Sequence, residues 1–144
     1  MAFNLKTLSI LVCVTVIYSH SFGQQSDWQK ATNWTLYNIQ GKSGWRVPID
    51  SMHLLDHKSL NVDSMRQFLT HTNIITNESA PVWMGTHFTT CILNGKLRKV
   101  EISTYGGFFY DEIDKKYYEI EADSRNYWLE YLAKSGAELQ SRSK

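Results

Sequence analysis

The sequence predicts a single α+β domain, with one antiparallel sheet of about five to seven strands and two or three helices packed mainly on one face. Three observations lead to this fold class. An Asn-Gly pair joins two β-rich runs, a second hairpin rich in aromatic residues follows it, and the stretch after that has apolar residues at helical spacing. The length of 144 residues fits one domain.

The clearest local signal is Asn94-Gly95, which lies between the runs 82–93 and 96–105. Both central residues of such a turn need positive φ, and asparagine and glycine adopt it readily. The turn also sets the hairpin register. It predicts the pairs Ile92 with Leu97, Thr89 with Val100, Phe88 with Glu101, and Met84 with Tyr105.

The second hairpin contains most of the aromatic side chains of this region. Gly106-Gly107 permits a sharp bend or bulge, after which residues 108–110 and 117–120 read as strands joined by a polar connection at 111–116. Rings on neighbouring strands pair across the ladder. Rings on one face are expected in the core, and rings on the other face are expected to stay exposed.

The segment before these hairpins has weaker signals. Residues 34–39 alternate as a strand with Trp34 and Leu36 on one face, and 40–44 reads as a turn. A short helix is predicted over 49–55 with Asp50 as its N-cap. A clearer helix is predicted over 61–71, capped by Asn61 or Asp63, and a strand over 72–76. The apolar residues of the helix predicted over 61–71 recur at helical spacing: Val62, Met65, Phe68 and Leu69.

A final helix is predicted over 124–134, with Asp123 as its cap. Trp128, Tyr131 and Leu132 form a stripe that suits docking on the sheet. Gly136 fits the position just past a helix end. The domain is therefore predicted to span 24–136, and 137–144 is predicted to be a flexible C-terminal tail.

Residues 1–23 have the layout of a cleavable secretory signal peptide. One charge, on Lys6, precedes an apolar run at 8–18, and the small-x-small pattern Ser21-Phe22-Gly23 precedes Gln24. The run is short for a membrane span, so an uncleaved anchor is the weaker alternative. A lipid anchor on Cys13 is disfavoured because Val12 is not small. The protein is therefore expected to be exported, to the periplasm or beyond the cell, without stable membrane insertion.

The composition narrows the classes of partner that the protein is expected to bind. Removal of residues 1–23 takes away Lys6, so 14 basic residues (15 − 1) face 14 acidic residues. A net charge near zero argues against nucleic acid and against electrostatic attachment to a membrane. Cys91 is then the single cysteine, so no internal disulfide forms and stability comes from packing. Five tryptophans predict an aromatic-rich core.

Constellations that suggest catalysis are weak, and neither a catalytic residue nor a cofactor or metal is predicted. His53 and His57 have the spacing of two ligands on a helix, but no third ligand is evident. Cys91 and His87 share a strand face, yet four residues of strand separate them by roughly 13 Å. A structural cysteine is therefore expected. The carboxylates at 111–123 alternate with basic residues and are read as a charged rim rather than a glycosidase pair.

The aromatic hairpin is the best candidate for recognition. Tyrosine offers a large contact area at little entropic cost and is common at interface hot spots. An acidic and aromatic surface would suit a basic partner. The predicted partner-contact residues are Tyr105, Phe109, Tyr110, Asp111, Glu112, Asp114 and Tyr117.

Residues 100–132 contain STYGGFFYD at 103–111 and NYWLEYL at 126–132. This part resembles the C-terminal part of small exported proteins of unknown role from gut Bacteroidota, a resemblance that transfers no catalytic residue. Some small periplasmic proteins are immunity proteins, which bind and block toxins. The predicted function is thus a non-catalytic exported binding protein of the envelope, most sharply an immunity or inhibitor protein. The alternatives are a carbohydrate- or peptidoglycan-binding module and a small hydrolase with a site assembled from distant residues.

Overall fold

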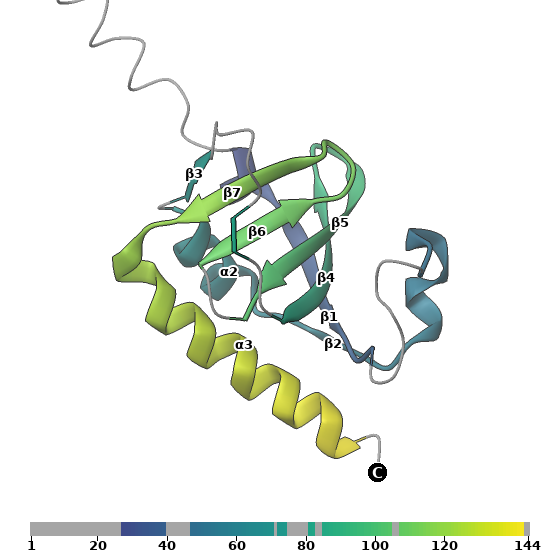
Figure 1. The fold of residues 1–144 in the computed structure, drawn as a ribbon. Helices are drawn as coiled ribbons and strands as arrows, with labels where there is room; N and C mark the ends of the chain where they lie inside the picture. Colours follow the sequence, from purple (N-terminus) through teal and green to yellow (C-terminus); the bar gives the residue numbers. More distant parts are fainter. Residues whose placement is uncertain are drawn as a thin grey trace, which may run out of the picture.

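The structure, a computed structural model, describes residues 27–39, 47–70, 72–74, 81–82, 85–104 and 107–142. The predicted signal peptide, the predicted turn at 40–44, and both Met84 and Tyr105 lie outside these residues. The described residues form one seven-stranded sheet in the order β2-β1-β4-β5-β6-β7-β3 (Figure 1). Every neighbouring pair is antiparallel. The predicted α+β class is confirmed.

The strands are β1 (Thr32–Tyr37), β2 (His57–Ser59), β3 (Thr72–Ile74), β4 (Thr86–Leu93), β5 (Lys96–Ser103), β6 (Phe108–Asp111) and β7 (Lys116–Ile120). The helices are the 3-10 helices η1 (Asp27–Lys30) and η3 (Ile49–Leu54) and the α-helices α2 (Val62–Leu69) and α3 (Ala122–Arg142). Strands β4 to β7 form a continuous meander, and the segment before them supplies both edges of the sheet.

The register of β4 and β5 is the one predicted from Asn94-Gly95. These two residues have φ of 51° and 72°. The three predicted pairs within the described residues are all present: Ile92 with Leu97, Thr89 with Val100, and Phe88 with Glu101.

The bend before β6 depends on Gly107, which has a φ of 62°. Its carbonyl accepts a hydrogen bond of 2.6 Å from the amide of Ile120. The side chain of Arg125 lies where a Cβ would stand, so glycine is needed both for the backbone conformation and for the close approach of α3.

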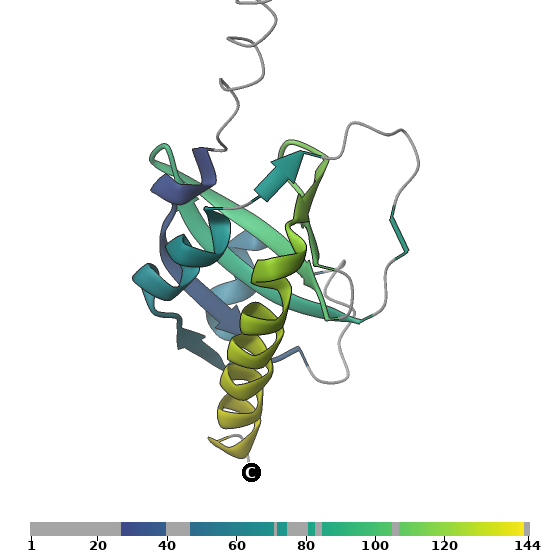
Figure 2. The same ribbon diagram turned by 90° about the vertical axis from the view of Figure 1, so that its left-hand side faces the viewer.

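Helices α2 and α3 lie on the same side of the sheet (Figure 2). Between the helices and the strands lies one hydrophobic core, and η1 contributes Trp28 to it. Trp28 packs edge-on against Phe109 and Tyr118, with ring centroids 5.0 and 5.3 Å apart. The core also contains Trp34, Leu36, Met65, Leu69, Cys91, Val100, Ile102, Ile120, Trp128, Leu132 and Leu139.

Helix α2 begins as predicted, because the side chain of Asn61 accepts a hydrogen bond of 2.8 Å from the amide of Ser64. The predicted cap of the preceding helix is wrong. Pro48 occupies the N-cap position of η3, and Asp50 lies inside its first turn.

Helix α3 is longer than predicted. It continues through Gly136 to Arg142, so Gly136 does not end it and residues 137–142 are not a tail. Leu139 lies two turns beyond Leu132 and is only 3% exposed. Burial of Leu139 stabilises the last turns and offsets the roughly 1 kcal/mol that glycine costs within a helix.

Alternation along the strands gives the sheet a second face, which points away from α2 and α3 and is called the outer face below. On β5, Arg98, Val100 and Ile102 point toward the helices. Lys99 and Glu101 point to the outer face. Lys99 donates a hydrogen bond of 3.3 Å to the carbonyl of Val47, which places the chain entering η3 over this face.

Candidate functional site

The sheet separates the predicted contact residues onto its two faces. Phe109 pairs with Ile102 across β5 and β6, and both point toward the helices. Tyr110 and Tyr117 pair across β6 and β7 on the outer face. Tyr105 lies outside the described residues.

Phe109 is a core residue. It is 1% exposed, and its ring stacks on that of Tyr118 with centroids 4.6 Å apart. The prediction that Phe109 contacts a partner is therefore wrong, because its side chain is covered by Trp28 and by the helices.

Asp111 is also buried, with an exposure of 0%. One carboxylate oxygen lies 3.1 Å from Nη1 of Arg98, and the other accepts a hydrogen bond of 2.9 Å from the amide of Ile113. Burial raises the pKa of Asp111, while the Ile113 amide and Arg98 oppose that rise. Asp111 therefore anchors the turn from within and cannot contact a partner directly.

The acidic turn, which the sequence suggested as a surface for a basic partner, is paired with bases of the protein itself. Asp114 lies 2.8 Å from Nη1 of Arg98, and Glu112 lies 2.8 Å from Nζ of Lys99. The three acids of the turn are thus each paired with a base of β5. The two bases, Arg98 and Lys99, are adjacent in sequence and point to opposite faces. The paired carboxylates on each face are therefore neutralised by a base on the same face.

Lys99, Glu101 and Glu112 form a charged cluster on the outer face. Lys99 is 2% exposed and Glu101 is 0% exposed. Burial, followed by the neighbouring Glu112, raises the pKa of Glu101 to about 8. Glu101 therefore keeps its proton at pH 7, and Lys99 faces a single carboxylate. Sequence reasoning missed this cluster, although the predicted pairing of Glu101 with Phe88 already marked the face on which it lies.

Tyr110 and Tyr117 lie beside this cluster with ring centroids 4.6 Å apart and planes 34° apart. Both rings are half-buried. Burial raises the pKa of Tyr110, as do Tyr117 and Glu112. Leu97, near the start of β5, and Ile113, in the turn between β6 and β7, are 49% and 53% exposed. We call Leu97, Tyr110, Glu112, Ile113 and Tyr117 the hairpin patch.

Cys91 lies on β4 with a fully buried side chain. Burial raises the pKa of its thiol, and the nearby Asp111 raises it further. The nucleophilic thiolate is therefore disfavoured, as expected of a structural cysteine. His87 lies four residues away on the same strand, toward the opposite end of the sheet.

The two histidines with ligand-like spacing do not share a helix. His53 lies in η3, whereas His57 lies in β2, where its Nδ1 is 2.9 Å from the carbonyl of Leu55 and its ring contacts Tyr37. In the described part of the chain, no group of three or more acidic, histidine or cysteine side chains is placed to hold a metal ion.

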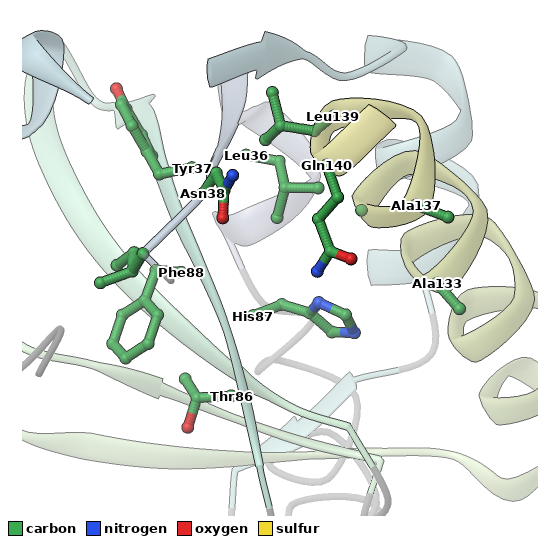
Figure 3. Close-up of a pocket in the computed structure, with 12 residues that line it drawn as sticks. Leu36, Tyr37, Asn38, Thr86, His87, Phe88, Ala133, Ala137, Leu139 and Gln140 are labelled. Carbon is green, nitrogen blue, oxygen red and sulfur yellow. The ribbon is translucent and has the colours of Figure 1, made fainter. Parts of the chain in front are cut away.

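A cavity of about 350 Å³ lies where the end of β1 and the start of β4 face the C-terminal half of α3. Figure 3 shows the ring of His87 and the amide of Gln140 directed into the same space, with Leu36 and Leu139 beside them. The described residues that line this cavity include no carboxylate and no thiol. With neither a carboxylate nor a thiol beside His87 among these residues, the hydrolase alternative gains no support from this cavity.

We found no match to this chain among protein-family models, curated proteins or solved structures. Among the described helices, none combines the length and apolar character needed to cross a membrane.

Proposed function

We propose that the protein is an exported, non-catalytic binding protein of the bacterial envelope. In its sharpest form it is an immunity or inhibitor protein, which blocks a toxin or an enzyme through the hairpin patch. The observation that carries this proposal is the tilted pair Tyr110 and Tyr117, half-exposed on the outer face while the neighbouring aromatic pair is buried in the core.

The composition of the patch supports protein contact. Tyrosines combine a large apolar ring with a polar tip and are enriched at binding hot spots. Leu97 on β5 and Ile113 in the turn between β6 and β7 add exposed apolar area at the same end of the sheet. Because Glu112 is paired with Lys99, aromatic and apolar anchors dominate this surface. A strongly basic partner is no longer required.

The position of the patch also supports recognition with little reorganisation. Tyr110 and Tyr117 lie on β6 and β7, which are flanked by β5 and β3 in the sheet. Hydrogen-bonded neighbours on both sides hold the backbone, so little conformational entropy is lost when a partner binds.

Affinity capture from an envelope extract of the source organism tests the proposal. The wild-type protein is compared with the double variant Tyr110→Ser, Tyr117→Ser. We expect the double variant to capture at least tenfold less partner than the wild type, because both anchors are removed. We also expect the captured partner to be an enzyme or toxin whose activity the wild-type protein inhibits.

The control variant is Tyr127→Ser, which removes an exposed tyrosine from α3 on the opposite side of the sheet. It should capture as well as the wild type. Equal capture by the double variant, with circular dichroism showing that it is folded, would exclude the patch. Mass spectrometry of the envelope-associated protein tests export separately, with an N-terminus at Gln24 as the expected result.

A further inference from the structure

The cavity beside α3 is independent of the hairpin patch. Its volume of about 350 Å³ lies at the small end of the range for ligand pockets, which is about 300–1,000 Å³. Its walls come from three elements that are distant in sequence, β1, β4 and α3, and one side is open to solvent. A ligand of one or two rings would fit a space of this size.

Small residues on α3 leave this space open. Ala133, Gly136 and Ala137 follow one another at i, i+3 and i+4, the spacing of a single helix face. All three line the cavity. A Cβ added at Gly136 would meet no heavy atom within 4 Å, so a larger side chain there would enter the empty space.

Two polar side chains with unused hydrogen-bonding groups point into the cavity (Figure 3). Within the described residues, neither the ring of His87 nor the side-chain amide of Gln140 has a hydrogen-bond partner. Burial lowers the pKa of His87, so the imidazole is neutral at physiological pH and presents one donor and one acceptor. Gln140 likewise presents both, and the exposed Ala133 and Ala137 supply apolar surface beside them.

None of the twelve residues recorded around the cavity carries a formal charge at neutral pH. A charged ligand would lose its hydration with no compensating partner. Groups that both donate and accept suit hydroxyls and amides, and the apolar surface suits a carbon-hydrogen ring face. We propose that this cavity is a binding site for a neutral sugar of one or two rings, held by His87 and Gln140 against Ala133 and Ala137 of α3.

Nuclear magnetic resonance titration of the labelled protein tests this assignment with cellobiose and N,N′-diacetylchitobiose as probes. We expect saturable shifts of the His87 ring and Gln140 side-chain amide signals with at least one of the two sugars. The variant Gly136→Leu should weaken binding at least tenfold, because the leucine fills the cavity. It should remain folded, since leucine favours helix more than glycine does.

The matched control is Lys134→Leu, which adds a leucine to an exposed position of the same helix outside the cavity. It should bind as the wild type does. The assignment is overturned if neither sugar shifts these signals, if Gly136→Leu binds as well as the wild type, or if glucuronate or glucosamine binds better than the neutral probes. Tyr110→Ser with Tyr117→Ser should leave sugar binding intact, so failure of the proposed function and failure of this site can be told apart.

Discussion

The two faces of the sheet carry the same kinds of group and use them differently. Each has an aromatic pair across β6 and β7 with ring centroids 4.6 Å apart, Phe109 with Tyr118 toward the helices and Tyr110 with Tyr117 on the outer face. Each also has a base of β5 paired with an acid: Arg98 with Asp111 at the end of β6, and Lys99 with Glu112 just after it. The two faces differ in how far other parts of the chain cover these rings. The helices bury the first pair of rings, and the second pair remains half-exposed, so environment decides which aromatic residues build the core and which can recognise a partner.

The largest expected effect tests the buried pair. Phe109→Ala should lower the free energy of unfolding by about 3–5 kcal/mol, because the lost transfer energy adds to the cavity that it leaves against Trp28 and Tyr118. Urea denaturation followed by tryptophan fluorescence measures it. A change below about 1 kcal/mol would mean that the two faces do not differ as described.

The next effect concerns the buried ion pair. Asp111→Asn should lower the free energy of unfolding by about 3 kcal/mol, because Arg98 remains buried and loses its enclosed carboxylate. The control Asp114→Asn should cost less than about 1 kcal/mol, since Asp114 is 44% exposed and solvent screens its pairing. Equal effects in urea denaturation would contradict this ranking.

The outer face should give the protein a pH dependence of stability. Glu101 has a pKa of about 8 in the folded protein against an ordinary 4.5, so between these values the folded state binds a proton that the unfolded state has released. Its stabilising contribution is complete below pH 4.5 and is lost as the pH rises toward 8. The slope is at most about 1.4 kcal/mol per pH unit.

The variant Glu101→Gln isolates this contribution, because glutamine has the shape of the protonated acid and does not ionise. Urea midpoints at pH 5, 6, 7 and 8 should be flatter for the variant than for the wild type. Glu130→Gln, on the exposed side of α3, should keep the wild-type slope. A wild-type midpoint that rises between pH 5 and 8 would refute the buried protonated carboxyl.

The smallest effect belongs to the outer rings. Tyr117→Thr keeps a residue that favours strands and removes one ring of the tilted pair. It should cost about 1 kcal/mol or less, the magnitude of a cross-strand pair. A loss comparable with that of Phe109→Ala would show that Tyr117 is a core residue and would weaken its proposed role in recognition.

Local signals in the sequence predicted much of the fold. Asn94-Gly95 gave the register of β4 and β5 because positive φ at two adjacent residues is a local property, and Asn61 gave the start of α2 for a similar reason. Strand β2 was missed because it is only three residues long and depends on pairing with β1. Gly136 was misread as a helix end. The helix continues past it because Leu139 is buried in the core, and a local sequence pattern does not reveal that burial.

The candidate sites were harder to predict. The aromatic hairpin was recognised, but assigning Phe109 and Asp111 to the core requires the bend at Gly107, which sets the register of β6 against β5. The cavity was missed entirely. His87 and Gln140 are 53 positions apart (140 − 87), and the sequence signal was only the small residues of α3. Of these, Gly136 was read as the helix end and Ala137 as the start of a tail.

The strand order also has a kinetic consequence. Strands β4 to β7 are consecutive neighbours, so each hairpin can close soon after the one before it. Strand β1 pairs with β4 and strand β3 pairs with β7, at opposite margins of that meander. Both β1 and β3 come from the part of the chain that precedes β4. Their docking closes the longest loops and is expected to come late in folding. Detachment of these margins would then be the first event when the protein opens.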